Sequence, residues 1–292
     1  MLRRFHLEEP ESVKDASDLL ARYGDSARAY AGGTELLLAM KEGLVHYEHL
    51  VNLKKIQGLD RIQHEDNLIR IGALATHRQV AESRLLQEHL PSFVRMEQNV
   101  ANIRVREVGT IGGNLCFAEP HADPGTLLLV FGAKLVAAKG SSQREIPAQN
   151  FFVDAYETAL EEDEVLTQIQ IPLPAERSGV AYMKFGYLER PSVGVALLLA
   201  LGEGGSIADI HVAVGCAGPA PKRVEEAEEL LRGKSLEEGS LLLPKAGEVA
   251  GRAAQAISDL HGSQEYKEHI AQVLLKRTFE QARKQCLQER EG

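Results

Sequence analysis

The sequence predicts an α+β protein of two domains. From Ile56 onward short strands and helices are mixed, and the last third of the chain reads as three apolar strands followed by three helices. Between these parts lies the best linker of the chain, Pro-Leu-Pro-Ala-Glu-Arg-Ser-Gly at 172–179. We therefore expect a first domain at 1–176, divided into subdomains 1–55 and 56–176, and a second domain at 177–292.

The first subdomain is predicted as a helix, a short strand, a glycine turn and a second helix. Ser12 begins the first helix, with Asp15 in a capping-box relation and Gly24 as the stop signal. Residues 27–31 form a strand that leads into a glycine pair, and a helix follows at 36–40. A further strand is expected at 51–53.

The second subdomain mixes strands with helices that have recognisable caps. Thr76 caps one helix, and a second helix is expected from about Leu86 through Asn99. Residues 127–131 are apolar throughout, which is typical of a buried helix. Strands are predicted at 68–72, 133–138 and 165–171.

The second domain begins with three apolar segments that fit a small antiparallel meander. The helix at 264–288 has Ser263 as its cap and a row of apolar side chains on one face. The predicted strands are 180–187, 193–201 and 207–215, and the other predicted helices are 223–231 and 245–260.

Composition excludes several classes of function. The net charge of −9 and the pI near 5.6 argue against a nucleic-acid partner, which needs a basic face. The chain has no secretory signal and no run of about 20 apolar residues, so we expect a cytoplasmic protein without a membrane span. Its three cysteines are too far apart for a C-x-x-C motif, which predicts no disulfide, iron–sulfur or other metal site.

Two glycine pairs, each beside a threonine, carry the functional argument. They are Ala31-Gly32-Gly33-Thr34 and Thr110-Ile111-Gly112-Gly113-Asn114. Glycine permits positive φ and has no Cβ, so backbone N–H groups can turn toward an anion, and two such loops could clamp a diphosphate. Each pair alone also fits an ordinary turn. The chain lacks G-x-G-x-x-G and G-x-x-x-x-G-K-[ST], which excludes the usual nicotinamide and nucleotide-triphosphate sites.

Together the two segments resemble the pyrophosphate-binding loops of the FAD-binding medium subunits of molybdenum hydroxylases, the group that contains xanthine dehydrogenase and aerobic carbon monoxide dehydrogenase. The resemblance continues over nearly the whole chain, through segments 71–73, 151–166, 182–185 and 262–266. It implies a two-part FAD-binding domain of the vanillyl-alcohol-oxidase (PCMH-like) kind, followed by a three-stranded antiparallel sheet with three helices.

The resemblance also implies which residues contact FAD, and it implies no catalytic residue in this chain. The expected contacts are Ala29, Tyr30, Ala31, Gly32, Gly33, Thr34, Glu35, Leu36, Val100, Ala101, Thr110, Ile111, Gly112, Gly113, Asn114, Asp123, Leu166 and Lys184.

Several of these residues have a plainer interpretation. A carboxylate repels phosphate, so physics alone favours Glu35 as a helix cap. Asp123 matches an acidic residue that hydrogen-bonds FAD, but it also fits a turn before Pro124. Lys184 matches a lysine that reaches the flavin ring, but it could also extend to water.

Other polar residues near these segments carry weaker hypotheses. His121 fits packing or surface better than catalysis. Arg104 and Arg106 could steer an anionic cofactor or pair with another subunit, with solvated side chains as the simpler interpretation.

The chemistry implied by the resemblance is that of the cofactor. A large subunit would oxidise substrate at a molybdopterin, a small subunit would carry two [2Fe–2S] clusters, and the FAD subunit would pass electrons to NAD+, a quinone or oxygen, within a dimer of heterotrimers. Two alternatives remain open. One is a self-contained FAD oxidase or reductase, and the other is a flavin-free scaffolding subunit in which the glycine loops are structural.

Overall fold

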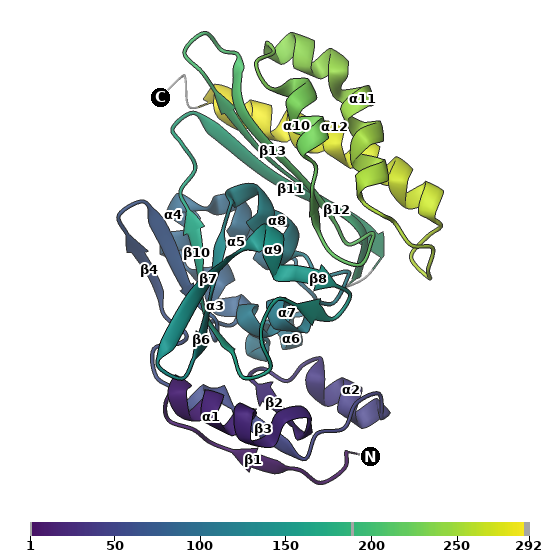
Figure 1. Cartoon of the computed structure of the whole chain (residues 1–292). Helices are drawn as coiled ribbons and strands as arrows, with labels where there is room; N and C mark the ends of the chain where they lie inside the picture. Colours follow the sequence, from purple (N-terminus) through teal and green to yellow (C-terminus); the bar gives the residue numbers. More distant parts are fainter. Residues whose placement is uncertain (1, 188–189, 289–292) are drawn as a thin grey trace. The chain divides into compact units, whose positions relative to one another are not determined.

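The computed structural model describes residues 2–187 and 190–288, and it has the predicted α+β composition (Figure 1). The chain forms two compact units. The first contains residues up to Ala118 together with Lys134–Ile171, and the second contains Glu119–Ala133 together with the residues from Pro172 onward. The chain therefore leaves the first unit after Ala118 and returns to it at Lys134.

The amino-terminal part of the first unit is a three-stranded sheet with two helices. Strands β1 (His6–Glu8), β3 (His49–Asn52) and β2 (Ala27–Tyr30) lie in that order, and β3 pairs in parallel with both neighbours. Helix α1 (Val13–Tyr23) begins as predicted, because the Ser12 hydroxyl accepts a hydrogen bond from the Asp15 amide at 3.1 Å. Helix α2 (Leu36–Glu42) follows the first glycine pair and ends at Gly43, which has φ +79°.

A five-stranded sheet forms the rest of this unit. Its order is β4 (Ile62–Glu65), β5 (Leu68–Gly72), β10 (Val165–Pro172), β6 (Lys134–Lys139) and β7 (Ser142–Pro147). The three inner strands were predicted from their apolar runs. The two edge strands have mostly polar, exposed side chains, so they lack the pattern by which a buried strand is recognised.

Short helices and a hairpin complete the first unit. The single helix predicted from Leu86 to Asn99 is wrong. Two helices, α4 (Arg84–His89) and α5 (Pro91–Glu97), replace it, because Leu90 leaves the helical conformation before Pro91. The remaining elements are α3 (His77–Glu82), α6 (Ile103–Val108), α7 (Ile111–Phe117), α9 (Ala148–Phe151), β8 (Phe152–Asp154) and β9 (Glu157–Thr158).

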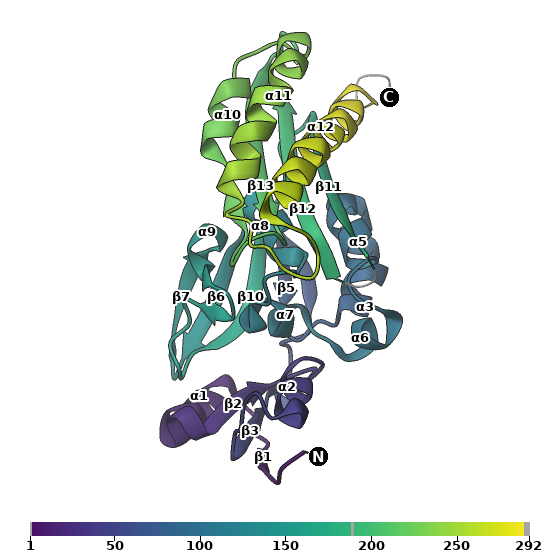
Figure 2. The same ribbon diagram turned by 90° about the vertical axis from the view of Figure 1, so that its right-hand side faces the viewer.

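The second unit is an antiparallel sheet with helices, as predicted. Its long strands are β11 (Ser178–Tyr187), β12 (Arg190–Leu201) and β13 (Ile207–Gly215), and a two-residue strand β14 (Lys222–Arg223) extends the sheet beside β13. The helices of the carboxy-terminal segment lie along one face of this sheet (Figure 2). They are α10 (Glu225–Leu231), α11 (Leu236–Ala253) and α12 (Gln264–Gln288).

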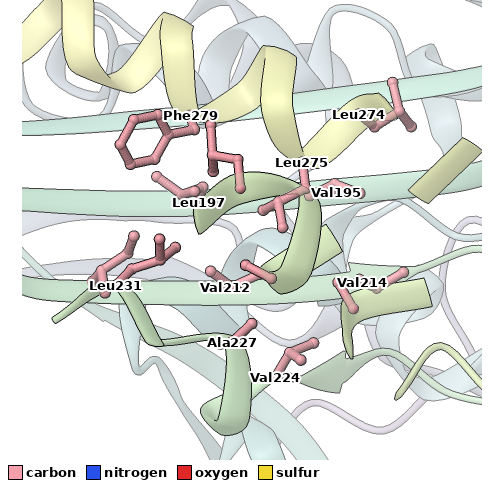
Figure 3. Close-up of a cluster of buried hydrophobic side chains, with 14 of the residues drawn as sticks. Val195, Leu197, Val212, Val214, Val224, Ala227, Leu231, Leu274, Leu275 and Phe279 are labelled. Atoms are coloured by element: carbon pink, nitrogen blue, oxygen red, sulfur yellow. The ribbon is translucent and has the colours of Figure 1, made fainter. Parts of the chain in front are cut away.

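The core of the second unit lies between that sheet and those helices. Alternate residues of β12, including Val195 and Leu197, pack with Leu231 of α10 and with Leu275 and Phe279 of α12 (Figure 3). Helix α8 (Pro124–Phe131) is buried along its whole length and packs on β12 and β13. Buried residues occur on both faces of β12, which explains its nearly continuous apolar sequence.

Helix α11 begins earlier than predicted. The prediction placed its start at Lys245, after Pro244, whereas the helix starts at Leu236 and contains that proline. A capping box between Ser235 and Glu238 sets the start, with Ser235 Oγ accepting from the Glu238 amide at 3.2 Å. None of the helices in the described part of the chain has the length and apolar character needed to cross a membrane.

Candidate functional site

The first glycine pair forms a bare turn between β2 and α2. Gly33 has φ +71°, a conformation that favours glycine. A Cβ on Gly32 would lie 2.3 Å from the Val108 carbonyl oxygen and 2.7 Å from the Gly109 Cα. The turn therefore packs directly on the backbone that precedes the second glycine pair. Two segments separated by about 75 residues in the chain thus meet without side chains between them.

The second glycine pair is the first turn of helix α7 and not a loop. Thr110 caps this helix, since its hydroxyl accepts from the Gly113 amide at 3.1 Å. The amides of Ile111 and Gly112 donate to Ala75 and Ala73 oxygens, both at 2.9 Å, and the Asn114 amide donates to the Thr110 oxygen at 3.0 Å. The expectation that these amides turn toward an anion is therefore wrong, because the fold already uses them.

The amides of the first pair differ in this respect. Within the part of the chain that the structure describes, the backbone N–H groups of Gly32, Gly33 and Thr34 have no hydrogen-bond partner. The Glu35 side chain makes no capping bond to α2, so the interpretation of Glu35 as a helix cap is also wrong. Adjacent free amides in a turn of this kind form a concave donor site for an anion.

Both glycine segments line one cavity of about 520 Å³ within the first unit. This volume lies within the roughly 300–1,000 Å³ that small-molecule and cofactor sites occupy. Residues of segments 73–74, 100–101 and 156–166 also line the cavity. Arg106, predicted to be solvated, instead donates to the oxygens of Val100 and Ala101 at 2.7 and 2.9 Å and so holds that part of the wall.

Most of the predicted contact residues line this cavity. They are Ala29, Ala31, Gly32, Gly33, Thr34, Glu35, Leu36, Val100, Ala101, Thr110, Gly112, Gly113, Asn114 and Leu166. Tyr30 and Ile111 are not among the lining residues. The Tyr30 ring lies under the Lys54 ammonium, 4.6 Å from it, and Ile111 is fully buried in the core. The second unit contains the two others, Asp123 and Lys184.

The sequence did not point to three other residues of the wall, Arg28, His77 and Cys116. Burial raises the pKa of the Cys116 thiol to about 12, although the positive charge of Arg28 opposes this shift. Cys116 is therefore a neutral side chain of the wall. Arg28 lies on β2 between Ala27 and Ala29, which also line the cavity, so strand alternation did not single it out.

Asp123 and Lys184 were predicted separately, and the structure joins them in one buried cluster of the second unit. Lys184 Nζ donates to Asp123 Oδ2 at 2.8 Å, and the Tyr182 hydroxyl donates to Asp123 Oδ1 at 2.6 Å. Burial, followed by the charge of Asp123, raises the pKa of Tyr182 well above its usual range. The interpretations of Lys184 as extending freely to water and of Asp123 as a simple turn residue are therefore wrong.

His121 lies between two carboxylates of the second unit. Its Nδ1 is 2.9 Å from Glu119 Oε1, and its Nε2 is 3.2 Å from Asp259 Oδ2. The hydrogen bond to Glu119 raises the pKa of His121 despite its partial burial. The fully buried ammonium of Lys267 reaches the same Asp259 oxygen at 2.6 Å. His121 thus connects the start of the 119–133 segment to the loop that precedes α12.

We expect this cluster to make stability depend on pH. Because the folded-state pKa of His121 is raised, its contribution is complete below about pH 6.5, the usual pKa of histidine, and is lost as pH rises through the folded value. Raising pH from 6 to 9 should therefore lower Tm, by about 2–4 °C for each 1 kcal/mol lost. Thermal unfolding of wild type and His121→Asn at both pH values measures this. An equal fall of Tm in the variant would contradict the assignment.

Comparison with known proteins decides the family. The family described as "FAD binding domain in molybdopterin dehydrogenase" matches residues 3–174, and the "CO dehydrogenase flavoprotein C-terminal domain" matches residues 189–282. The chain is an FAD-binding medium subunit of the molybdenum hydroxylase family. The carbon monoxide dehydrogenase medium chain of Hydrogenophaga pseudoflava is 31% identical over 288 residues, which cover 97% of this chain and 98% of that one.

Other members of the family agree. The nicotine 6-hydroxylase medium subunit of Paenarthrobacter nicotinovorans is 30% identical, and the match covers 94% of this chain and 95% of the relative. A solved structure of Hydrogenophaga pseudoflava carbon monoxide dehydrogenase matches this chain with a TM-score of 0.93 at 31% identity, over 98% of this chain and 99% of that chain. The chain is thus an oxidoreductase subunit whose cofactor is FAD.

The cavity of this medium subunit fits FAD by its own chemistry. Asn114 Oδ1 is buried there without a hydrogen-bond partner, which is costly unless a ligand supplies a donor. The unpartnered amides of residues 32–34 suit an anion, and Gly32 and Gly33 carry no Cβ that would hold it away from the backbone. FAD has hydroxyl donors for Asn114 Oδ1 and a diphosphate for the amides of residues 32–34.

Proposed function

We propose that this chain is the FAD-carrying electron-transfer subunit of a heterotrimeric molybdenum hydroxylase. In this proposal a small partner subunit supplies electrons from [2Fe–2S] clusters, and substrate is oxidised at the molybdopterin of a large partner subunit. Bound FAD supplies the capacity to accept electrons and to pass them to NAD+, a quinone or oxygen. The names of the relatives, which are medium chains and medium subunits, support a multi-subunit assembly.

The observation that carries this proposal is the set of unpartnered amides at Gly32, Gly33 and Thr34 on the cavity wall. In our proposal these three donors bind the diphosphate, and the carboxamide of Asn114 accepts a hydrogen bond from a ligand hydroxyl. Gly112 and Gly113 act differently from the first pair. A Cβ on Gly112 would lie 2.6 Å from both Cβ and O of Ala73, so the absent side chain lets α7 pack closely on that backbone.

The remaining expectations from the sequence stay predictions. They are the contacts of Asp123 and Lys184 with the flavin, the domain limits 1–176 and 177–292, the cytoplasmic location and the dimer of heterotrimers. The ion pair between Lys184 and Asp123 supports a common role for these two residues, since a change in either alters the charge around the other.

The proposal is tested on the purified chain and on the assembled complex. We expect the isolated chain to bind FAD, to show flavin absorption bands and to oxidise no organic substrate on its own. Co-expression should yield a complex that also contains iron, sulfide and molybdenum. Oxidation of an organic substrate by the isolated chain would instead support a self-contained oxidase, and a colourless chain with no FAD affinity would support a scaffolding role.

A further inference from the structure

A buried histidine and glutamate form a pair at the wall of the FAD cavity. His77 is the first residue of α3, and Glu97 is the last residue of α5. His77 Nδ1 lies 2.6 Å from Glu97 Oε2, and the two side chains are 3% and 0% exposed. Neither residue belongs to the contacts expected from the sequence. A buried pair of this kind needs a reason, since ionisable groups are rarely buried without one.

The pair is incompletely satisfied within the protein. Glu97 Oε1 is buried and has no hydrogen-bond partner, so His77 is the group that compensates the carboxylate. The hydrogen bond to Glu97 fixes the ring and engages Nδ1. His77 lines the cavity, and within the described ranges its other nitrogen, Nε2, has no partner. A carboxylate that orients one imidazole nitrogen leaves the other for a ligand.

The position of His77 relates it to both glycine segments. Its amide donates to the Gly109 oxygen at 3.0 Å, and its Cδ2 would lie 3.4 Å from a Cβ built on Gly109. Gly109 is also the residue on which Gly32 packs. His77 therefore lies beside the contact between the two segments, next to the turn that carries the unpartnered amides.

The wall of the cavity has more carboxylates than cationic side chains. Several carboxylates line the wall, including Asp25, Glu35 and Glu157. Among the lining residues of the described chain, Arg28 is the one arginine and there is no lysine. A diphosphate carries negative charge, and uncharged amides alone leave that charge uncompensated. A ring N–H of His77 on the cavity side would add a side-chain donor to the amides of residues 32–34.

We propose that His77, held in place by Glu97, is a further FAD-binding residue whose Nε2 donates a hydrogen bond to an oxygen of the diphosphate. This inference rests on the proposed function, since it requires FAD in the cavity of the first unit. It assigns a role to a buried pair that the expected FAD contacts do not include.

Two amide substitutions at His77 separate ligand binding from folding. His77→Asn keeps a donor near the position of Nδ1, so it can still bond Glu97 but cannot reach the cavity. His77→Gln places its amide nitrogen near the position of Nε2. We expect His77→Asn to weaken FAD binding about tenfold or more, because a hydrogen bond to a charged group is lost. We expect His77→Gln to stay within about threefold of wild type, because a neutral donor remains.

Affinities are measured by titration of the full-length chain with FAD, and ADP is tested as a competitor. ADP contains the diphosphate but lacks the flavin, so His77→Asn should lower its affinity by a similar factor. His64→Asn is the matched control, since His64 is an exposed histidine of the same unit that does not line the cavity. Thermal unfolding without FAD shows that each variant is folded.

The outcomes distinguish this inference from the proposed function. If wild type binds no FAD, the proposed function fails. If wild type binds FAD and His77→Asn binds it equally well, or if His77→Gln is the weaker binder, the role of His77 is overturned. Loss of FAD affinity without loss of ADP affinity would overturn the diphosphate as its target.

Discussion

Gly32→Ala is expected to lower the affinity for FAD strongly while leaving a folded protein. The new Cβ would lie 2.3 Å from the Val108 oxygen and 2.7 Å from the Gly109 Cα, and neither backbone atom can rotate away as a flexible side chain could. The turn must therefore move off the second segment, and the amides of residues 32–34 move with it. Overpacking of this kind costs about 3 kcal/mol, which corresponds to an affinity roughly 100-fold weaker.

The measurement is a fluorescence titration of the variant with FAD, compared with wild type and with Gly43→Ala. Gly43 ends the same helix α2 and has φ +79°. A Cβ added to Gly43 would meet open space. Its substitution strains the backbone by roughly 1 kcal/mol without touching the cavity. A Gly32→Ala chain that binds FAD within about threefold of wild type would show that the contact between the two segments is dispensable for binding.

The second large effect is expected at Glu228, a buried carboxylate of α10 in the second unit. It is 2% exposed, and its Oε1 accepts from the Val212 amide at 2.9 Å and from Arg223 Nε at 2.8 Å. Arg223 Nη2 donates to the other carboxylate oxygen, Oε2, at 2.9 Å, so the guanidinium and the carboxylate form a bidentate pair. This carboxylate fixes α10 to β13 through the Val212 amide. Val212 and Leu231 belong to the core cluster of Figure 3.

Glu228→Ala should lower the free energy of unfolding by about 3 kcal/mol, because it leaves the partly buried guanidinium of Arg223 and the buried Val212 N–H without this partner. Chemical denaturation followed by circular dichroism measures the loss. Glu229→Ala is the matched control on the same helix, since Glu229 is exposed, and it should change stability by less than about 0.5 kcal/mol. Equal stability of the two variants would rule out the proposed role of Glu228.

Much of the fold could be predicted because its signals are local. The cap at Ser12, the apolar run of α8 and the three long strands of the second unit each depend on neighbouring residues, and the structure confirms them. Polar edge strands such as β4 and β7 could not be predicted in this way. Their pairing depends on an inner strand that offers a free edge, and nothing in their own sequence reports it.

The helix predictions failed at prolines, because a proline can end a helix or lie inside one. Pro91 separates α4 from α5, whereas α11 continues through Pro244. The difference is tertiary. The residues before Pro244 are held as a helix by the Ser235 capping box and by the burial of Leu236 and Leu243 in the core. A proline ends a helix unless packing on both sides of it compensates the lost hydrogen bond.

The candidate site shows the same division. The glycine pairs could be found in the sequence because only glycine lacks a side chain. Both pairs line the cavity. Their different uses were not visible. Whether an amide is free depends on which carbonyl lies opposite, and Ala73 and Ala75 take the amides of the second pair while those of the first remain free in the described structure.

By itself, the sequence determined the class of fold and the two bare-backbone segments, since both follow from residue type and spacing along the chain. The family came from the resemblance of these segments to known medium subunits. The tertiary structure alone decided which segment offers donors to a ligand, that Asp123 binds Lys184, and that His77 and Glu97 meet at the cavity wall. The physical reason is that hydrogen bonds and ion pairs act over about 3 Å in space. Residues that are far apart in the sequence reach that distance only after the chain has folded.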